Sequence, residues 1–274
     1  MKSNILILFC CFLFLASCQA PSIEEYTLLP HPVDIKYIPG MVKLKTQPTL
    51  VYPGELANEA LLLQCYLSSD FSVQATLKKN KKKGDIILQL DPAVLPEQAE
   101  GYILDATSGN IVLKANSPAG ILNAIQTFRQ VLKVKDGRLI VQKSTLTDYP
   151  VFSWRAFMLD EGRYFKGKEV VFDLLDEMAA LKMNVFHWHL TDDQGWRIEI
   201  KKYPKLTEIG AWRDSSEIDH FGSNRYDGRR HGGFYTQEEI KQVVVYAAYR
   251  NSTVILQILM PGYACDAIAA YPWL

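Results

Sequence analysis

Short apolar runs separated by polar turns mark the first half of the chain. Strand-like runs occur at residues 86–90 (IILQL), 101–107 (GYILDAT) and 110–116 (NIVLKAN). The last two are joined by "SGN", Ser108 to Asn110, a sequence that suits the tight connection of a hairpin. The pattern therefore predicts short β-strands, two of them paired in a hairpin.

The segment that follows, residues 117–134, carries the period of a helix. Ser117 can cap its first turn, and Pro118 stands at a first-turn position that tolerates proline. Apolar side chains recur at helical spacing at Ile121, Ile125, Phe128 and Leu132. Residues 25–146 are accordingly expected to form a small α+β domain.

The rhythm changes in the second half, where strand-like and helix-like segments alternate. Thr236 and Glu239 form the T-x-x-E pattern of a capping box at the start of one helix. In chain order the segments are a strand at 155–160, a helix at 168–183, a strand at 184–190, a helix at 236–250 and a strand at 252–259. This order with buried-looking strands predicts parallel β/α units, in a barrel or an open sheet.

The first residues predict export from the cell. Lys2 precedes the apolar run 5–16 (ILILFCCFLFLA), which is too short to span a bilayer comfortably. "LASC", Leu15 to Cys18, resembles the lipobox of bacterial lipoproteins, so residues 1–18 are expected to be a lipoprotein signal with Cys18 as the acylated residue. An ordinary signal peptide ending in cysteine is the alternative. Gln19 in place of aspartate favours a periplasmic or surface location on the outer membrane.

Charge and cysteine content narrow the class of protein. Thirty basic residues balance thirty acidic ones, so no overall field recruits nucleic acid. The one basic run, 77–85 (LKKNKKKGD), is expected to be a solvated hairpin turn. Cys10 and Cys11 leave with the signal, so only Cys65 and Cys265 remain as possible disulfide partners, and both are expected to be buried free thiols.

Polar and aromatic residues concentrate in the segment 184–200 (NVFHWHLTDDQGWRIEI). Residues two apart in a strand share a face, so His187 and His189 point one way while Phe186 and Trp188 point the other. A zinc site built from the two histidines and Asp192 or Asp193 is one interpretation. Histidines that hydrogen-bond neighbouring carboxylates inside a barrel are the other, and we expect no bound metal or cofactor.

The carboxyl ends of parallel strands carry the chemistry in β/α folds. Asp160, Asp192 and Asp193 all follow strand segments at this end, and Trp196 and Trp212 add flat apolar surfaces. Carboxylates for hydroxyl groups beside aromatic platforms are typical of carbohydrate sites, although a single tryptophan is more often core packing.

The chain resembles the family 20 glycoside hydrolases, the β-N-acetylhexosaminidases. The resemblance is carried by 157–165 (FMLDEGRYF), 183–213 (MNVFHWHLTDDQGWRIEIKKYPKLTEIGAWR) and 232–250 (GGFYTQEEIKQVVVYAAYR). Residues 100–132 resemble the small α+β domain that precedes the catalytic domain in this family. The resemblance implies a TIM barrel, of which residues 147–274 would be the truncated first part. It also implies a retaining enzyme that removes terminal N-acetylglucosamine or N-acetylgalactosamine from glycans. The substrate's own acetamido oxygen is the nucleophile in such enzymes.

The resemblance also implies roles for individual residues. Arg155 matches the arginine that holds hydroxyls of the terminal sugar, and its alternative role is an ion pair with Asp160. Asp192 and Asp193 match the aspartate pair after the second strand, with Trp196 beside them. His189 either orients these aspartates or satisfies a buried carbonyl. The catalytic Asp-Glu pair of the family follows the fourth strand, so no catalytic residue is predicted in this chain.

The third strand departs from the family pattern V-x-P-E-x-D/E-M-P-G-H. The chain reads VILQILMPGY at 254–263, with Leu256 for the proline, Gln257 and Leu259 for the acids and Tyr263 for the histidine. Tyrosine cannot shuttle protons near neutral pH as imidazole does. We therefore expect these residues alone, with about three of eight strands, to be unstable or inactive. A non-catalytic glycan-binding surface lipoprotein, or an inactive paralogue, is the alternative.

Overall fold

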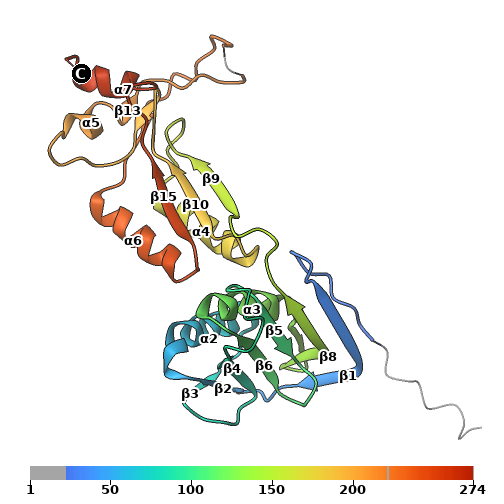
Figure 1. Ribbon diagram of the computed structural model, residues 1–274. Helices are drawn as coiled ribbons and strands as arrows, with labels where there is room; N and C mark the ends of the chain where they lie inside the picture. The colour runs from blue at the N-terminus through green and yellow to red at the C-terminus, as the bar shows by residue number, and fades with distance from the viewer. Residues whose placement is uncertain (1–22, 221, 274) are drawn as a thin grey trace, which may run out of the picture. The chain divides into compact units, whose positions relative to one another are not determined.

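The computed structural model describes residues 23–220 and 222–273, which form two compact units divided between Tyr149 and Pro150 (Figure 1). The predicted signal peptide and Cys18 lie outside the described residues. Within those residues, no helix has both the length and the apolar character to cross a bilayer.

Unit 1 is a mixed sheet with two helices on one face. Its strands lie in the order β1-β8-β5-β6-β4-β2-β3, with β7 paired to β8, and β2, β3, β4 and β6 run parallel to one another. The elements are β1 (Asp34–Lys43), β2 (Thr49–Tyr52), η1 (Gly54–Leu56), α2 (Ala57–Phe71), β3 (Thr76–Lys79), β4 (Ile86–Leu90), β5 (Tyr102–Asp105), β6 (Ile111–Ala115), α3 (Pro118–Val131), β7 (Lys133–Lys135) and β8 (Arg138–Asp148).

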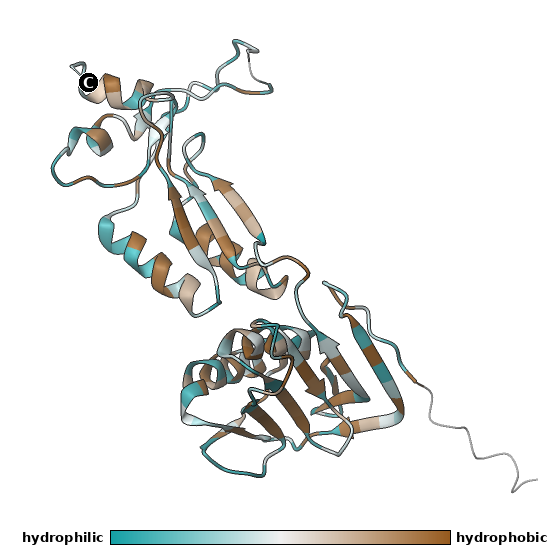
Figure 2. Cartoon of the chain, in the orientation of Figure 1, coloured by the Kyte–Doolittle hydropathy of each residue, from teal (hydrophilic) through white to brown (hydrophobic). Residues whose placement is uncertain are grey.

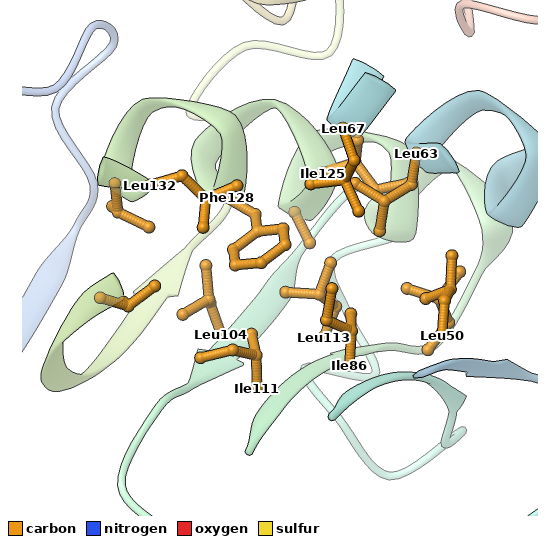
Figure 3. Packing of buried hydrophobic residues seen from close by; sticks show 14 of the residues in the cluster. Leu50, Leu63, Leu67, Ile86, Leu104, Ile111, Leu113, Ile125, Phe128 and Leu132 are labelled. Carbon is orange, nitrogen blue, oxygen red and sulfur yellow. The ribbon is translucent and has the colours of Figure 1, made fainter. Parts of the chain in front are cut away.

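The core of unit 1 lies between α2, α3 and the sheet. Ile125 and Phe128 of α3 pack onto Leu104 and Leu113 of the strands (Figure 3). Ser117 caps α3 by accepting the Gly120 N–H at 3.1 Å. The predicted helix is therefore confirmed. So is the predicted hairpin, because β5 and β6 are adjacent and antiparallel.

The prediction for the lysine-rich segment was wrong. β3 and β4 flank β2 and both run parallel to it, so residues 80–85 connect two parallel strands by crossing back over β2. A hairpin turn would instead have placed β3 and β4 antiparallel to each other. The hydropathy of a short segment cannot distinguish these two connections.

Unit 2 is built on three parallel strands in the order β15-β10-β9. Its elements are β9 (Ala156–Asp160), α4 (Lys168–Ala180), β10 (Val185–His189), β11 (Thr191–Asp192), β12 (Gly195–Trp196), α5 (Lys205–Glu208), β13 (Trp212–Arg213), β14 (His231–Gly232), α6 (Gln237–Ala248), β15 (Thr253–Gln257) and α7 (Cys265–Ala270). Parallel strands joined through α4 and α6 confirm the predicted α/β class.

The two faces of β10 differ as its alternation predicts. Phe186 and Trp188 are fully buried in a cluster that includes side chains of α4 and α6. In Figure 2, brown apolar segments alternate with teal polar ones along α4 and α6. The opposite face carries His187 and His189. His189 therefore lies on the face of the sheet that the helices do not cover.

The prediction that both cysteines are buried was wrong. Cys65 and Cys265 are free, as expected, but exposed. Cys65 lies on α2 between the buried Leu63 and Leu67, so the helical period turns its side chain outward. Cys265 begins α7 at the surface.

The capping box of α6 provides a test of local stability. Thr236 accepts the Glu239 N–H at 3.2 Å, and the Glu239 carboxylate accepts the Thr236 N–H at 3.0 Å. We expect Thr236→Ala to lower the free energy of unfolding by about 1 kcal/mol. Chemical denaturation of the full chain measures this. Lys241→Ala, on the exposed side of the same helix, should change it by less than about 0.5 kcal/mol, and equal losses would contradict a specific role for the cap.

Candidate functional site

The carboxyl ends of the three parallel strands of unit 2 meet at one edge. The register places His189, the last residue of β10, opposite Asp160 on β9 and Gln257 on β15. Thr191 and Asp192 follow directly in β11. Polar side chains from β9, β10 and β15, and from the short strand β11, therefore lie together at the end of the sheet where β/α folds place their sites.

Arg163 joins two of the predicted aspartates in one ionic cluster. Its guanidinium lies 2.6 Å from the Asp160 carboxylate and 3.1 Å from the carboxylate of Asp192. The Arg163 N–H also donates to Asp160 at 3.0 Å. Asp192 is buried, whereas Arg163 is exposed, so one buried carboxylate meets a cation that solvent and a ligand can reach.

His189 lies between the two aspartates. Its Nε2 is 2.9 Å from the carbonyl oxygen of Thr191, which is a hydrogen bond. Nδ1 is 3.6 Å from an oxygen of Asp160, and Nε2 is 3.6 Å from an oxygen of Asp192. Of the two roles considered from the sequence, the structure shows the hydrogen bond to a buried carbonyl, and the ring also lies between the carboxylates of Asp160 and Asp192.

Asp160 is ionised at neutral pH in this arrangement. Burial alone pushes its pKa up, but hydrogen bonds from Arg163 and the charges of His189 and Arg163 outweigh burial and lower the pKa. The same hydrogen bond with Asp160 raises the pKa of Arg163. The cluster therefore offers fixed negative acceptors and a fixed positive donor, which is what a ligand rich in hydroxyl groups requires.

Asp193 points away from this cluster. It is exposed, and its carboxylate accepts the N–H of Cys265 at 3.3 Å. Its own N–H donates to the Asp192 carboxylate at 2.7 Å. Of the predicted aspartate pair, the structure brings Asp192 to the cluster through its side chain and Asp193 only through its backbone.

The structure separates Arg155 from these aspartates and corrects its predicted grouping with them. Arg155 precedes β9 and lies at the level of Asn184, five residues before His189. That is about 16 Å along the strand direction. Its side chain donates to the carbonyls of Lys182 and Phe152 at the amino end of the sheet. The ion pair with Asp160 considered for Arg155 is formed by Arg163 instead.

The predicted aromatic and third-strand residues occupy two different environments. Trp196 is only 4% exposed and donates its indole N–H to the Ile198 carbonyl at 2.7 Å, so it is a core residue. Its ring also lines an apolar cavity of about 370 Å³ beside Tyr203 and Tyr271. Tyr263 is 61% exposed and close enough to Arg163 to contribute to that residue's raised pKa.

A buried arginine holds the loops that carry the cluster. Arg197 is fully buried, and its guanidinium donates only to backbone carbonyls. The acceptors and distances are Glu161 at 3.0 Å, Ala211 at 2.5 Å, Gly162 at 3.1 Å, and Gly233 and Gln194 at 3.3 Å each. The loops after β9 and β10 and the excursion before α6 therefore converge on one side chain.

Comparisons with known proteins bear on this site. Residues 152–274 match the model for the glycosyl hydrolase family 20 catalytic domain, and residues 25–149 match the model for domain 2 of the same family. The chain belongs to glycosyl hydrolase family 20. The expected family membership is thus confirmed, and all residues of the cluster lie in the catalytic-domain match.

Relatives and solved structures agree with this assignment. A β-hexosaminidase of Porphyromonas gingivalis is 36% identical over 97% of this chain and 35% of the relative. A β-hexosaminidase of Vibrio furnissii is 45% identical over 69% of this chain and 31% of the relative. The family 20 exo-β-N-acetylglucosaminidase of Vibrio harveyi, solved with N-acetylglucosamine, superposes with a TM-score of 0.81 at 33% identity, covering 94% of this chain and 40% of that one. The chain spans about a third of the length of the curated relatives.

Several residues of this family 20 site were missed from the sequence. Arg163 lies in the segment FMLDEGRYF, three residues after Asp160, the acid that ends β9. That position at the carboxyl end of a strand could have identified Arg163 as a candidate site residue. Glu161 is fully buried and accepts the Lys166 N–H at 2.7 Å and the Tyr235 hydroxyl at 3.1 Å. Arg213 donates to the carbonyl of Arg163 at 2.8 Å. The contacts of Glu161 and Arg213 depend on how the loops fold, and no local sequence pattern predicts that.

The described residues contain no group of three or more histidine, cysteine, aspartate or glutamate side chains placed to hold a metal ion.

Asp266, in α7, is a buried carboxyl whose Oδ2 has no hydrogen-bond partner among the described residues. Burial raises the pKa of Asp266 to about 6, against a smaller lowering effect of the Ala267 N–H and Arg197.

Arg197 gives the first prediction from this site. Arg197→Lys keeps the charge but replaces the planar fork by a single ammonium group, which cannot reach five carbonyls. We expect a loss of about 2–4 kcal/mol in the free energy of unfolding, because buried carbonyls remain unsatisfied. Denaturant titration measures it. Arg229→Lys, at an exposed position, is the matched control, and a comparable loss in both variants would refute the specific role of Arg197 in holding the loops together.

Asp266 gives a prediction of pH dependence. Its folded-state pKa of about 6 exceeds the ordinary value of 3.8, so the folded state favours the protonated form and loses stability as pH rises from about 4 to 6. Asp266→Asn should become more stable relative to the unmodified chain over this range, by on the order of 2 kcal/mol. Unfolding free energies measured from pH 4 to 7 test this. The exposed Asp136→Asn serves as control, and a difference independent of pH would contradict the buried-acid interpretation.

Proposed function

We propose that this chain is the sugar-holding first part of an exo-acting β-N-acetylhexosaminidase. The observation that carries the proposal is the cluster of Asp160, Arg163, His189 and Asp192 at the carboxyl edge of the strands in a family 20 catalytic-domain match. The substrate is a terminal N-acetylglucosamine or N-acetylgalactosamine of a glycan. No nucleic acid and no cofactor take part.

The chemistry of the cluster suits a pyranose ring. Ionised Asp160 accepts hydrogen bonds from sugar hydroxyls, and the exposed guanidinium of Arg163 donates to hydroxyl oxygens. His189 keeps the carboxylates of Asp160 and Asp192 apart and in place. Retention of configuration follows from attack by the substrate's acetamido oxygen, which is already tethered to the ring and has little translational entropy left to lose.

The three strands β9, β10 and β15 are proposed to be the first three of a (β/α)8 barrel. In the family pattern the Asp-Glu pair that orients the acetamido group and protonates the leaving oxygen follows the fourth strand. We therefore propose that the 274 residues alone bind the sugar without hydrolysing it.

A non-catalytic glycan-binding role is the second candidate, and one observation favours it. Tyr263 stands where the family pattern has histidine, and it is exposed beside Arg163. A phenol beside a cation can donate to a ligand but does not relay protons near neutral pH as an imidazole does. The lipobox-like segment ending at Cys18 supports a further proposal, that the protein is exported and held on the outer membrane by lipid.

The two arginines provide the test of the sugar site. We expect chitobiose to bind the full chain in calorimetry, and Arg163→Gln to weaken binding by at least about tenfold because a charge-assisted donor is lost. Arg155→Gln should change the affinity by less than about twofold, since Arg155 lies at the other end of the sheet. Thermal unfolding of each variant confirms that it is folded.

A chromogenic N-acetylglucosaminide tests the proposed inactivity of these 274 residues. Binding of chitobiose without release of the chromophore supports the sugar-holding role. Release above background by the 274-residue chain would overturn the proposed inactivity. Loss of chitobiose binding in Arg155→Gln but not in Arg163→Gln would overturn the site itself.

A further inference from the structure

The lysine-rich segment 80–85 of unit 1, here called the lysine strap, is held across one face of the sheet. At its start the N–H of Asn80 donates to the Tyr52 carbonyl at 2.8 Å, at the carboxyl end of β2. At its end the N–H of Asp85 donates to the Thr49 carbonyl at 2.9 Å, at the amino end of β2. The strap therefore covers the whole length of β2.

Gly84 allows the strap to lie directly on the sheet. A Cβ at this position would be 2.6 Å from the Val51 side chain and 3.0 Å from the Thr49 carbonyl. Leu50 and Ile86 belong to the core beneath α2 and α3, so Val51 and Ile87, their neighbours along the strands, face away from the helices. The strap consequently lies on the face of the sheet opposite the helices.

A cavity of about 520 Å³ lies at the carboxyl ends of β2 and β4, next to the first residues of the strap. That volume lies within the usual range for small-molecule sites, about 300–1,000 Å³. The cavity is lined by Val51, Tyr52, Pro53, Glu55, Asn80, Lys81, Lys82, Ile87, Leu88, Gln89 and Leu90. Tyr52, Leu88 and Leu90 belong to the helix side of the sheet, and Val51, Ile87 and Gln89 belong to the other side, so the cavity lies at the strand ends, where residues of both faces reach it.

The polar groups of this cavity have unused hydrogen-bonding capacity. Within residues 23–220 and 222–273, the side chains of Tyr52, Lys81, Lys82 and Gln89 form no hydrogen bond or ion pair. The Asn80 side chain, by contrast, accepts the Gly54 N–H at 3.1 Å and fixes the strap to η1. The wall of the cavity is thus anchored while its ligand-binding groups are free.

The local charge is positive although the chain as a whole is neutral. Lys81 and Lys82 line the cavity with Glu55 as the one carboxylate among its lining residues. Lys114 on β6 lies directly opposite Gln89 on β4, and cross-strand partners share a face, so it adds a third cation on this side of the sheet. An anionic group entering the cavity meets a positive potential.

We propose that this cavity binds an acidic sugar residue, carboxylated or sulfated, of a polysaccharide. The lysines take the anionic group, Gln89 takes a hydroxyl, and the ring packs on Tyr52 and the apolar side chains beside it. Inorganic phosphate could contact the lysines but has no apolar surface to pack on the apolar side chains of the cavity, so a free anion fits the cavity less well. The site is separate from the cluster at Arg163 and does not depend on the function proposed there.

The experiment uses acidic probes that contain no amino sugar. Tetragalacturonate supplies carboxylates and a carrageenan tetrasaccharide supplies sulfates, with cellotetraose as the neutral control. Calorimetry on the full chain should detect at least one acidic probe and not cellotetraose, with affinity falling as salt rises. Lys81→Gln/Lys82→Gln should weaken binding about tenfold, because two charge-assisted contacts are lost. Lys201→Gln/Lys202→Gln, an adjacent exposed pair in unit 2, should bind within about twofold of the unmodified chain.

The outcomes decide between the alternatives. Tyr52→Phe should keep the ring and bind within about threefold of the unmodified chain, whereas Tyr52→Ala should lose about tenfold or more. Equal affinity for inorganic phosphate and the oligosaccharides would overturn the sugar assignment. Lysine-dependent binding to phosphatidylglycerol vesicles without binding of either oligosaccharide would also overturn it. Undiminished binding of both acidic probes by the double lysine variant would remove the site altogether.

Discussion

The geometry of unit 2 depends on one buried guanidinium. Arg197 has no carboxylate within its hydrogen-bonding set and donates instead to five carbonyls from separate loops. Burial lowers its pKa to about 10, which leaves it charged at neutral pH. Removing such a charge from water costs several kcal/mol, so the loops that supply the carbonyls are constrained to meet there. Gly195 is part of this constraint, because a Cβ at that position would come within 2.2 Å of the guanidinium.

The charged cluster follows from that constraint. Arg197 binds the carbonyls of Glu161 and Gly162, the two residues that separate Asp160 from Arg163. It therefore fixes the loop on which Arg163 turns back toward Asp160 and Asp192. Arg213 binds the carbonyl of Arg163 from the other side. Two arginines thus hold the loop that carries the exposed Arg163 guanidinium, so that loop has little conformational entropy left to lose.

Local patterns in the sequence predicted the hairpin of β5 and β6, the helices α3, α4 and α6, and the edge at which β9 and β10 end, but α2 and β2 were not predicted. Ser117 and Thr236 predicted the starts of their helices, because capping depends on a neighbour only three residues away in the sequence. Asp160, His189 and Asp192 could be grouped because parallel strands end together. The choice of Arg155 over Arg163 failed because both flank the same strand, and only the strand's direction and the hydrogen bonds of Lys182 and Phe152 show which end each one occupies. The prediction of a hairpin at the lysine strap was wrong for a related reason. Only the order of the strands in the sheet distinguishes a crossover from a hairpin, and a local pattern does not give that order.

The substitutions on the third strand acquire a physical reason from the structure. Gln257 replaces an acid of the family pattern, and its Oε1 is buried without a hydrogen-bond partner among the described residues. An ionised carboxylate there would leave a buried charge unpaired, which costs more than an unsatisfied amide oxygen. Leu259 replaces another acid, yet its backbone N–H still donates to the Thr191 hydroxyl at 2.8 Å and keeps the loop in place. Gln257 therefore avoids a buried charge without a hydrogen-bond partner, while the carboxylates of Asp160 and Asp192 lie beside Arg163.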